Sequence, residues 1–310
     1  MRGTGKPDIQ LGTDYNSALE KWAKLHNHIP ITIGTVQQAI DRWREKVLPT
    51  YTVKNTFAQY KNYLTNVENA FGRMAWHEVR LPVLREYLDR RSAKTSGNRE
   101  MAVFALVWKK AQFWEMVDTP WPALGLQAKD WKNPELARVV DVTDEMFDAI
   151  YSHSDRILRD AMDISTATGM RITDVRTIRM PVDGVIRFKA SKTGKWAEFE
   201  VSQSPILSAL VERRQAMKAY CVMLLCSDTG RQVSEFMLSE QRWNAAKKAA
   251  IKANRHLKDQ LENLYLRDMR KRAANLADDL DAASVLLQHS STKLTSDHYR
   301  TKPTRLKAVR

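Results

Sequence analysis

The sequence predicts a mainly α-helical protein of two domains, the first all-helical and the second carrying a small β-sheet (α+β). Apolar residues recur every three or four positions through most of the chain, which is the spacing of one helix face. Two short segments, 184–189 and 196–201, instead flank a turn with the glycine and polar content of a hairpin. Proline clusters around Pro120 and Pro134 interrupt the helical pattern. We therefore predict an extension over 1–30, a helical domain over 31–120, a linker over 121–134, the α+β domain over 135–300 and a tail over 301–310.

The helices of the first domain follow from apolar spacing and from prolines. Val36, Ile40 and Trp43 lie on one face of a helix that Pro49 ends. Pro82 marks the start of another helix. The predicted helices of this domain are 36–47, 54–71, the one that begins at Pro82, and 98–117, with a further helical stretch in the extension near 16–26.

The second domain mixes helices with the predicted hairpin. Its strands are 184–189 and 196–201, joined by a turn over 190–195. The apolar run 220–226 contains both cysteines of the chain, Cys221 and Cys226, and we interpret it as a buried strand with reduced thiols. The predicted helices are 143–152, 159–168, 173–178, 204–220, 239–253, 261–279 and a last pair across 281–299.

The charge of the chain points to a polyanionic partner. Among 310 residues, 50 Lys and Arg face 36 Asp and Glu, which leaves a net charge of +14 and a pI near 9.7. Nucleic acid is the commonest partner of such an excess, and the alternative is a basic protein without that partner. No apolar run is long enough to span a bilayer, and the first residues lack the apolar core of a signal peptide. We expect a cytoplasmic protein that does not bind membranes.

Two pairs of charged residues are candidates for binding an anion. Arg171 and Asp174 are three residues apart, so in a helix the carboxylate can orient the guanidinium and leave its outer edge free for phosphate. Arg267 and Arg270 have the same spacing, and two cations on one helix face repel each other unless an anion lies between them. Each pair has a plainer interpretation, as a surface ion pair or as a solvated basic face.

Three other side chains complete the chemistry needed to bind a phosphodiester and attack it. Lys192 lies at the tip of the predicted hairpin, His289 begins a turn after an apolar helix, and Tyr299 lies eleven residues from the end of the chain. Each one alone is more simply explained as a turn lysine, a capping histidine or a packing tyrosine. Their combination with the three arginines of these two pairs favours a site of phosphoryl transfer.

These segments, taken in order, resemble the boxes of the tyrosine recombinase family, the phage integrases in particular. The resemblance covers about 135–300, and the helices before it resemble the family's core-binding domain, with Gly97-Asn98-Arg99-Glu100 opening its last helix. Single boxes are weak signals, but five in order are a strong one. The matching segments are Ala167-Thr168-Gly169-Met170-Arg171-Ile172-Thr173-Asp174, Ser191-Lys192-Thr193-Gly194, Leu266-Arg267-Asp268-Met269-Arg270, Leu286-Leu287-Gln288-His289-Ser290-Ser291 and Tyr299.

The resemblance implies site-specific DNA strand exchange without a cofactor or a metal ion. Tyr299 is the implied nucleophile, which forms a 3′-phosphotyrosine and frees a 5′-hydroxyl. Arg171 and Arg270 are the implied clamps on the phosphate, Lys192 the proton donor to the leaving oxygen, and His289 a hydrogen-bond partner of the phosphate. The implied partners are double-stranded DNA, three further copies of the chain in a homo-tetramer, and a host or phage DNA-bending protein, in a bacterial cytoplasm or nucleoid.

Two departures from the family pattern matter. Arg267 stands where the family usually has histidine, and an arginine has no acceptor for the tyrosine proton. We hypothesise that Arg267 favours the phenolate by its charge, leaving proton removal to water or the phosphate. His289 and Tyr299 are ten residues apart, one more than expected, which an extra loop residue would absorb.

The alternative functions are a sequence-specific DNA-binding protein with an impaired site and a type IB topoisomerase-like enzyme.

Overall fold

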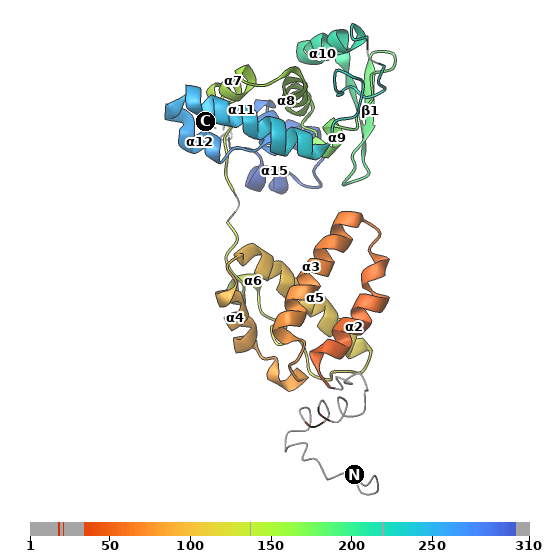
Figure 1. The fold of residues 1–310 in the computed structure, drawn as a ribbon, viewed down its shortest axis with the longest axis vertical. Coiled ribbons are helices and arrows are strands. Elements are labelled where there is room, and N and C mark those ends of the chain that lie inside the picture. The colour runs from red at the N-terminus through yellow and green to blue at the C-terminus, as the bar shows by residue number, and fades with distance from the viewer. Residues whose placement is uncertain (1–17, 19–20, 22–33, 137, 219, 302–310) are drawn as a thin grey trace, which may run out of the picture. The chain divides into compact units, whose positions relative to one another are not determined.

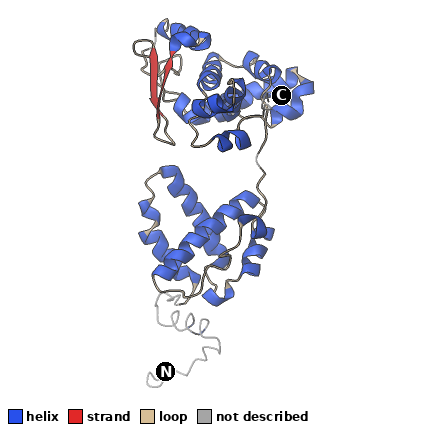
Figure 2. Cartoon of the chain, turned by 180° about the vertical axis from the view of Figure 1, so that it is seen from behind, coloured by secondary structure: helices blue, strands red, loops and turns tan. Residues whose placement is uncertain are grey.

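The computed structural model describes residues 34–136, 138–218 and 220–301, together with Ala18 and Lys21, and the chain divides into two compact units, Met1–Leu136 and Ala137–Arg310. The helix predicted near 16–26 lies outside the described residues apart from Ala18 and Lys21, and so does nearly all of the tail over 301–310. Figure 2 shows helices in the first unit and helices with a small β-sheet in the second. The predicted fold class is therefore confirmed for the part of the chain that is described.

The first unit consists of helices around an aromatic core. Its elements are α2 (Val36–Lys46), a 3-10 turn (Leu48–Thr50), α3 (Lys54–Phe71), a second 3-10 turn (Trp76–Glu78), α4 (Leu81–Arg90), α5 (Lys94–Phe113) and α6 (Ala128–Trp131). Helix α5 begins four residues before the predicted start and ends when Glu115 adopts a left-handed φ of 58°. Phe104 and Trp108 of α5 pack edge-on against Trp121 with ring centroids 5.4 and 5.5 Å apart.

The segment 121–134, where we predicted a linker, packs with the first unit. Trp131 is buried in its core, and Asn98 of α5 exchanges two hydrogen bonds of 2.8 and 3.0 Å with the backbone of Asn133. The division between the units falls after this segment, between Leu136 and Ala137. Proline interrupts the helices here, but tryptophan and the backbone hydrogen bonds keep the segment on the core.

The second unit is built around α8, which is buried over most of its length. Its elements are α7 (Asp144–Ser152), α8 (Arg156–Thr168), α9 (Ile172–Val175), β1 (Val185–Lys189), β2 (Trp196–Glu200), a 3-10 turn (Val201–Gln203), α10 (Pro205–Gln215), a π-helical turn (Met237–Arg242), α11 (Trp243–Ala253), 3-10 turns at Arg255–Leu257 and Leu266–Asp268, α12 (Lys258–Glu262), α13 (Met269–Leu276), α14 (Leu280–Leu286) and α15 (Thr292–His298). In Figure 1, α8 lies between α7 and α10, and it also packs against α13.

The two strands form an antiparallel hairpin in the predicted place. Their register pairs Val185 with Glu200 and Lys189 with Trp196. Arg187 and Glu198 form a cross-strand ion pair of 2.8 Å, a contact of the kind that stabilises neighbouring strands. Gly194 adopts a left-handed φ of 69° in the turn between the strands, which explains the glycine there.

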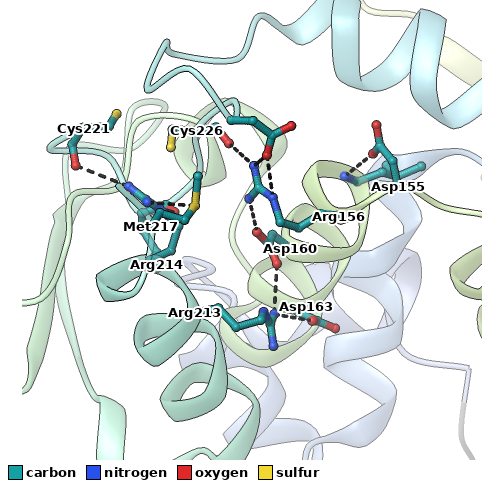
Figure 3. Close-up of polar contacts among 12 residues, drawn as sticks. Asp155, Arg156, Asp160, Asp163, Arg213, Arg214, Met217, Cys221 and Cys226 are labelled. Carbon is teal, nitrogen blue, oxygen red and sulfur yellow. Dashed lines mark hydrogen bonds and ion pairs between the residues drawn. The ribbon is translucent and has the colours of Figure 1, made fainter. Parts of the chain in front are cut away.

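Two predicted elements of this unit are wrong. Residues 261–279 do not form one helix, because Tyr265 is extended and the Asp268 carboxylate accepts its backbone N–H at 2.9 Å, so a new helical segment begins there. The segment 220–226 does not form a continuous strand. Its backbone pairs with 178–180 only around Met223, where Met180 donates to Val222 and Leu224 donates to Ile178, each at 2.9 Å. Arg214 of α10 donates to the carbonyl groups of Cys221, Met223 and Leu224, and Figure 3 shows its contact with Cys221. Both cysteines are free thiols, and Cys226 is buried.

A network of ion pairs joins α8 to its neighbours, as Figure 3 shows. Asp160 of α8 is almost fully buried and forms ion pairs of 2.9 Å with both Arg156 and Arg213. Arg156 also pairs with Asp228 at 2.6 Å, which ties the loop after Cys226 to α8. This network fixes α10 and that loop on the helix whose end carries Gly169. Within the described residues, no helix is long and apolar enough to cross a membrane.

Candidate active site

Six predicted site residues line one cavity of about 870 Å³ in the second unit. They come from segments far apart in the sequence: the start of α9, the β1–β2 turn, the start of α13, the turn after α14 and the end of α15. The six residues are Arg171, Lys192, Arg267, Arg270, His289 and Tyr299. Asp174, the seventh predicted residue, is buried beside the cavity but does not line it.

Arg270 is the most buried of the three arginines among these residues, and hydrogen bonds hold its guanidinium in place. It is 6% exposed, and its guanidinium donates to the backbone carbonyls of Gly169 and Leu287. Its Nε has no hydrogen-bond partner among the described residues. Burial, and then the neighbouring charge of Arg171, lowers the pKa of Arg270 to about 10. The guanidinium therefore remains positive at neutral pH in a place where an anion would be strongly attracted.

Gly169 explains why the first arginine box has its sequence. It ends α8 with a left-handed φ of 64°, and a Cβ at this position would lie 2.9 Å from Leu287 of the turn after α14. The glycine therefore lets the chain reverse against α14 while its carbonyl group accepts a hydrogen bond from Arg270. Arg171 follows two residues later as the N-cap of α9 and lines the cavity.

The predicted pairing of Arg171 with Asp174 is wrong. Asp174 instead accepts the backbone N–H of Ser191 at 2.9 Å, and no ion pair joins it to Arg171 among the described residues. Arg171 is the N-cap of α9 and has an extended backbone, so the i, i+3 spacing of a continuous helix does not apply to this pair. The carboxylate therefore positions the β1–β2 turn, and its charge also favours the protonated form of Arg270, raising the pKa of that residue against the larger effects of burial and Arg171.

Lys192 is an exposed side chain on a turn that is fixed at both ends. Asp174 holds the backbone of Ser191, and the ammonium of Lys195 approaches the carbonyl oxygen of Gln288 at 3.5 Å. Lys192 lies between these two contacts, lines the cavity and has no hydrogen bond to a described residue. A flexible cation on an anchored turn can reach a ligand in the cavity without moving the backbone.

His289 is a half-buried, neutral imidazole. Its Nδ1 lies 2.8 Å from the Thr295 hydroxyl, and its Nε2 lies 3.4 Å from Nη2 of Arg270. Because arginine can only donate, Nε2 accepts in this arrangement and the ring proton resides on Nδ1. Burial, and then the charges of Arg270 and Arg171, lowers the pKa of His289 to about 4. A phosphate bound among these cations would counter their effect and favour a proton on Nε2.

Tyr299 ends α15 with its ring against the cations. The ring packs beside Ala274, Ala283 and Leu287, its centroid lies 4.6 Å from that of His289, and the Arg270 guanidinium lies 5.6 Å from it. The ten-residue spacing from His289 is occupied by a short loop and the seven residues of α15. Nearby, Gln288 adopts a left-handed φ of 53° as α14 ends.

Residues directly after the tyrosine hold it in place, a role that no pattern in the sequence predicts. The Arg300 guanidinium donates to the backbone carbonyls of Ala274 and Ala277 at 2.9 and 3.0 Å, at the end of α13. Thr301 exchanges hydrogen bonds with Asn275 at 2.6 and 2.9 Å. A cation beside the free carbonyl groups of a helix C-terminus is a favourable arrangement. Arg300 lies 23 to 26 residues after these carbonyl groups, so local sequence patterns do not reveal the contact. Arg300 thereby fixes the position of Tyr299.

Arg267 lies against the ring of Tyr265, whereas Arg270 and His289 lie against the ring of Tyr299. Arg267 is exposed, and its guanidinium lies 4.6 Å from the ring centroid of Tyr265. It has no hydrogen bond or ion pair with a described residue. The structure thus places Arg270, and not Arg267, against the ring of Tyr299. Within the described residues, no cluster of three or more His, Cys, Asp or Glu side chains is placed to hold a metal ion.

Comparison with known proteins finds similarity in structure but not in sequence. The sequence matches no protein-family model and no curated protein. A lambda integrase dimer bound to a COC′ core site has a TM-score of 0.70 and 16% identity, covering 94% of this chain and 88% of that one. A lambda integrase tetramer bound to a Holliday junction has a TM-score of 0.69 and 17% identity, covering 96% and 92%.

A transposon protein shows the same likeness. The Tn1549 transposon integrase in complex with circular intermediate DNA has a TM-score of 0.64 and 16% identity, covering 87% of this chain and 96% of that one. Identities this low establish the fold and leave the chemistry to be argued from the residues. The resemblance predicted from the sequence is confirmed at this level: the chain has the fold of the tyrosine recombinases, as found in the lambda and Tn1549 integrases.

Proposed function

We propose that the chain is a site-specific DNA recombinase, an integrase of a phage or another mobile element, which cleaves and rejoins DNA through a 3′-phosphotyrosine. The observation that carries the proposal is the position of the Tyr299 ring, beside His289 and facing the buried cation of Arg270. Arg171 and Lys192 line the same cavity with no protein partner for their charges among the described residues. A phosphodiester supplies the missing negative charge.

In the proposed cleavage step, the Tyr299 oxygen attacks the scissile phosphorus and the bond to the 5′-oxygen breaks. Arg171 and Arg270 bind the nonbridging oxygens, whose negative charge grows in the transition state. Lys192 gives a proton to the departing 5′-oxygen, so that a neutral hydroxyl leaves. Attack by the 5′-hydroxyl of a partner strand reverses the step and returns the proton to the lysine. Atoms and charges balance without a nucleotide or an oxidant.

The proton of Tyr299 is lost beside Arg270. Arg270 is the cation beside the attacking phenol, because its guanidinium lies 5.6 Å from the Tyr299 ring centroid while Arg267 stacks on Tyr265. We therefore assign to Arg270, and not to Arg267, the role of the cation beside the tyrosine that loses its proton. Water or the phosphate accepts the proton. His289 then donates a hydrogen bond from Nε2 to the bound phosphate.

The proposed assembly is a tetramer on DNA. The similar lambda integrase structures contain a dimer on a core site and a tetramer on a Holliday junction. We extend a homo-tetramer to this chain, with double-stranded DNA as the substrate and an accessory DNA-bending protein as a further partner. The net charge of +14 fits such a substrate, and binding should weaken steeply as salt rises.

A covalent trapping experiment tests the proposed function. The substrate is a duplex selected for binding to the protein, with nicks placed so that the cleaved fragment diffuses away. We expect the wild type to form a covalent protein–DNA band, and Tyr299→Phe to bind the same duplex and form none, a loss of at least about 1,000-fold. Tyr220→Phe changes a tyrosine that is 91% exposed and should form the band normally. Absence of a band with bound wild-type protein contradicts the proposal.

Two alternative functions predict different results in the same experiment. A DNA-binding protein with an impaired site, which the arginine at position 267 favours, binds the duplex but forms no covalent band. A type IB topoisomerase-like enzyme forms the band and relaxes supercoiled DNA, but does not recombine two sites. Recombination between two copies of the selected duplex separates our proposal from both alternatives.

A further inference from the structure

A second group of cations surrounds Tyr265 in the wall of the same cavity. The Arg267 guanidinium lies 4.6 Å from the centroid of this ring, the Arg138 guanidinium 4.9 Å and the Lys247 ammonium 5.4 Å. Arg138, Arg267 and Tyr265 line the cavity, together with Lys271. An aromatic face attracts cations and orients a stacked guanidinium, which leaves the N–H groups at its edge free to bind another group.

This group carries more positive charge than the protein neutralises. Asp268, which is 1% exposed, forms an ion pair with Arg138 and also accepts the N–H of Tyr265. Among the described residues, no carboxylate forms an ion pair with Lys247, Arg267 or Lys271. Two further acids line the cavity: Glu235 pairs with Arg176, whereas Glu240 accepts a hydrogen bond from the neutral amide of Asn244 and keeps its charge. Four cations around Tyr265 therefore face two carboxylates, those of Asp268 and Glu240.

Arg267 is the member of this group that has no structural task. Arg138 donates to the carbonyl of Asn263 at 2.7 Å, Lys247 to the carbonyls of Glu262 and Leu264 at 3.3 Å, and Lys271 to the carbonyl of Arg138. Arg267 donates to no acceptor in the described chain and rests only on the ring. Its N–H groups are therefore available to a ligand in the cavity.

The charges around Tyr265 and those around Tyr299 form two distinct groups. Burial lowers the pKa of Lys271, Asp268 opposes this effect, and Arg138 and Arg267 add to it. The charges that act most on Arg270 are instead those of Arg171, Tyr299 and Asp174. The three-residue spacing of Arg267 and Arg270 thus places them in different groups, one exposed and one buried.

We propose that Arg267, with Arg138 and Lys271, forms a second phosphate site that binds a non-scissile phosphate of the same DNA strand whose scissile phosphate lies at Arg270. The inference rests on the proposed function for the identity of the strand. Phosphates follow one another every ~3.4 Å along the axis of each strand, so one strand crossing the cavity presents more than one. A guanidinium can bind a phosphate through two parallel hydrogen bonds, which an imidazole cannot. The site gives arginine at position 267 a use that histidine would not serve.

Removing the charge of single phosphates tests the proposal. Duplexes carry one neutral methylphosphonate each, at the scissile position or at one neighbouring position, and the Kd is measured for the wild type and for Arg267→Gln. On unmodified DNA we expect Arg267→Gln to weaken binding by about tenfold and to reduce the salt slope by about 1. On DNA that is neutral at one particular non-scissile position, both proteins should bind with equal affinity.

Matched variants keep the result interpretable. Arg255→Gln changes an exposed arginine of the same unit that does not line the cavity, and it should show no coupling to any phosphate. Arg267→Lys keeps the charge and should restore part of the affinity. Thermal unfolding of each variant separates a loss of binding from a loss of folding.

The outcomes separate this site from the proposed function. Coupling of Arg267 to the scissile phosphate alone overturns the second site, and so does weaker binding without coupling to any phosphate. Coupling to a non-scissile phosphate supports it. The covalent band of the wild type is measured on the same duplexes. If that band is absent while Arg267 still couples to a single phosphate, Arg267 binds a DNA phosphate and the recombinase proposal fails.

Discussion

The two tyrosines of the cavity, Tyr299 and Tyr265, meet arginines in opposite ways. Arg270 faces Tyr299 from a buried position, where two backbone carbonyls fix its guanidinium. Arg267 lies on Tyr265 in contact with solvent and is oriented by the ring alone. Spacing in sequence therefore does not determine the role of an arginine. A rigid, desolvated cation suits a transition state, whereas an exposed one suits a phosphate whose position is less critical.

The same substitution at both positions gives the largest expected contrast. Arg270→Lys replaces two guanidinium nitrogens, each of which donates to one carbonyl, by a single ammonium, so we expect the free energy of unfolding to fall by about 1–3 kcal/mol. Cleavage in the covalent trapping experiment should fall by about 100-fold or more, because the fixed donors are lost. Arg267→Lys should change the free energy of unfolding by less than about 0.5 kcal/mol. Equal effects of the two variants on unfolding and on cleavage would remove the distinction between the two groups.

A smaller effect is expected from Arg300, which fixes Tyr299 without touching the phosphate. Arg300→Gln loses the hydrogen bonds to the carbonyls at the end of α13, so the phenol is less often in position to attack. We expect cleavage to slow by about 10- to 100-fold while the Kd for DNA is unchanged. Arg300→Lys should recover part of the rate, and Lys293→Gln, an exposed change on α15, should have no effect. Cleavage by Arg300→Gln at the wild-type rate would show that α15 needs no such anchor.

A histidine at position 267 tests the group around Tyr265 more gently. Arg267→His restores the residue that the family resemblance leads us to expect, and it leaves Arg270 against Tyr299. We expect cleavage to remain within about tenfold of the wild type, with the loss confined to DNA affinity. Complete loss of cleavage in this variant, with DNA still bound, would place Arg267 in the chemical step.

The sequence predicts those features of the site that depend on neighbouring residues. Gly169 ends a helix and the turn over 190–195 joins two strands because local backbone conformation decides both. The partner of Asp174 was not predictable in this way, since Ser191 lies seventeen residues away and comes close only through the fold. The strand predicted over 220–226 is reduced to isolated bridges for a similar reason. It pairs with 178–180 only around Met223, and Arg214 donates to the carbonyl groups of Met223 and Leu224, a contact that no periodicity reveals.

The group around Tyr265 shows the same limit more clearly. Arg138 and Asp268 are 130 residues apart in the sequence, yet they form one ion pair beside the ring. The order of the family boxes did bring Arg267 to attention, because an arginine replaced the expected histidine. Its neighbours belong to no box, so only the packing of α11, α13 and the chain before α7 brings them together. Chemistry that arises from such packing has to be found in the structure.

The smallest expected effect concerns the pH dependence of His289, and it tests whether the cations around Tyr299 act on it as the geometry requires. Burial, Arg270, Arg171, Lys195 and His298 lower the pKa of His289 to about 4, from 6.5 in the unfolded chain. Between these values the unfolded chain takes up a proton that the folded protein does not. The stability that neutral His289 provides is therefore fully present above pH 6.5 and is lost as the pH falls towards 4. His289→Gln should retain about 1 kcal/mol more of its neutral-pH stability than the wild type at pH 5, after allowance for screening by solvent.

The comparison must be made between variants because another group titrates in the same range. Burial raises the pKa of Asp163 to about 6, so protonation of this carboxyl stabilises the folded protein as the pH falls. This effect opposes that of His289 in the wild type and cancels when His289→Gln is compared with it. The measurement is urea unfolding at pH 7 and pH 5 without DNA, with His256→Gln, an exposed histidine away from the cavity, as the matched control. If His289→Gln and His256→Gln lose the same stability on acidification, the cations around Tyr299 do not act on His289. The burial that distinguishes Arg270 from Arg267 then has no electrostatic effect on the histidine beside it.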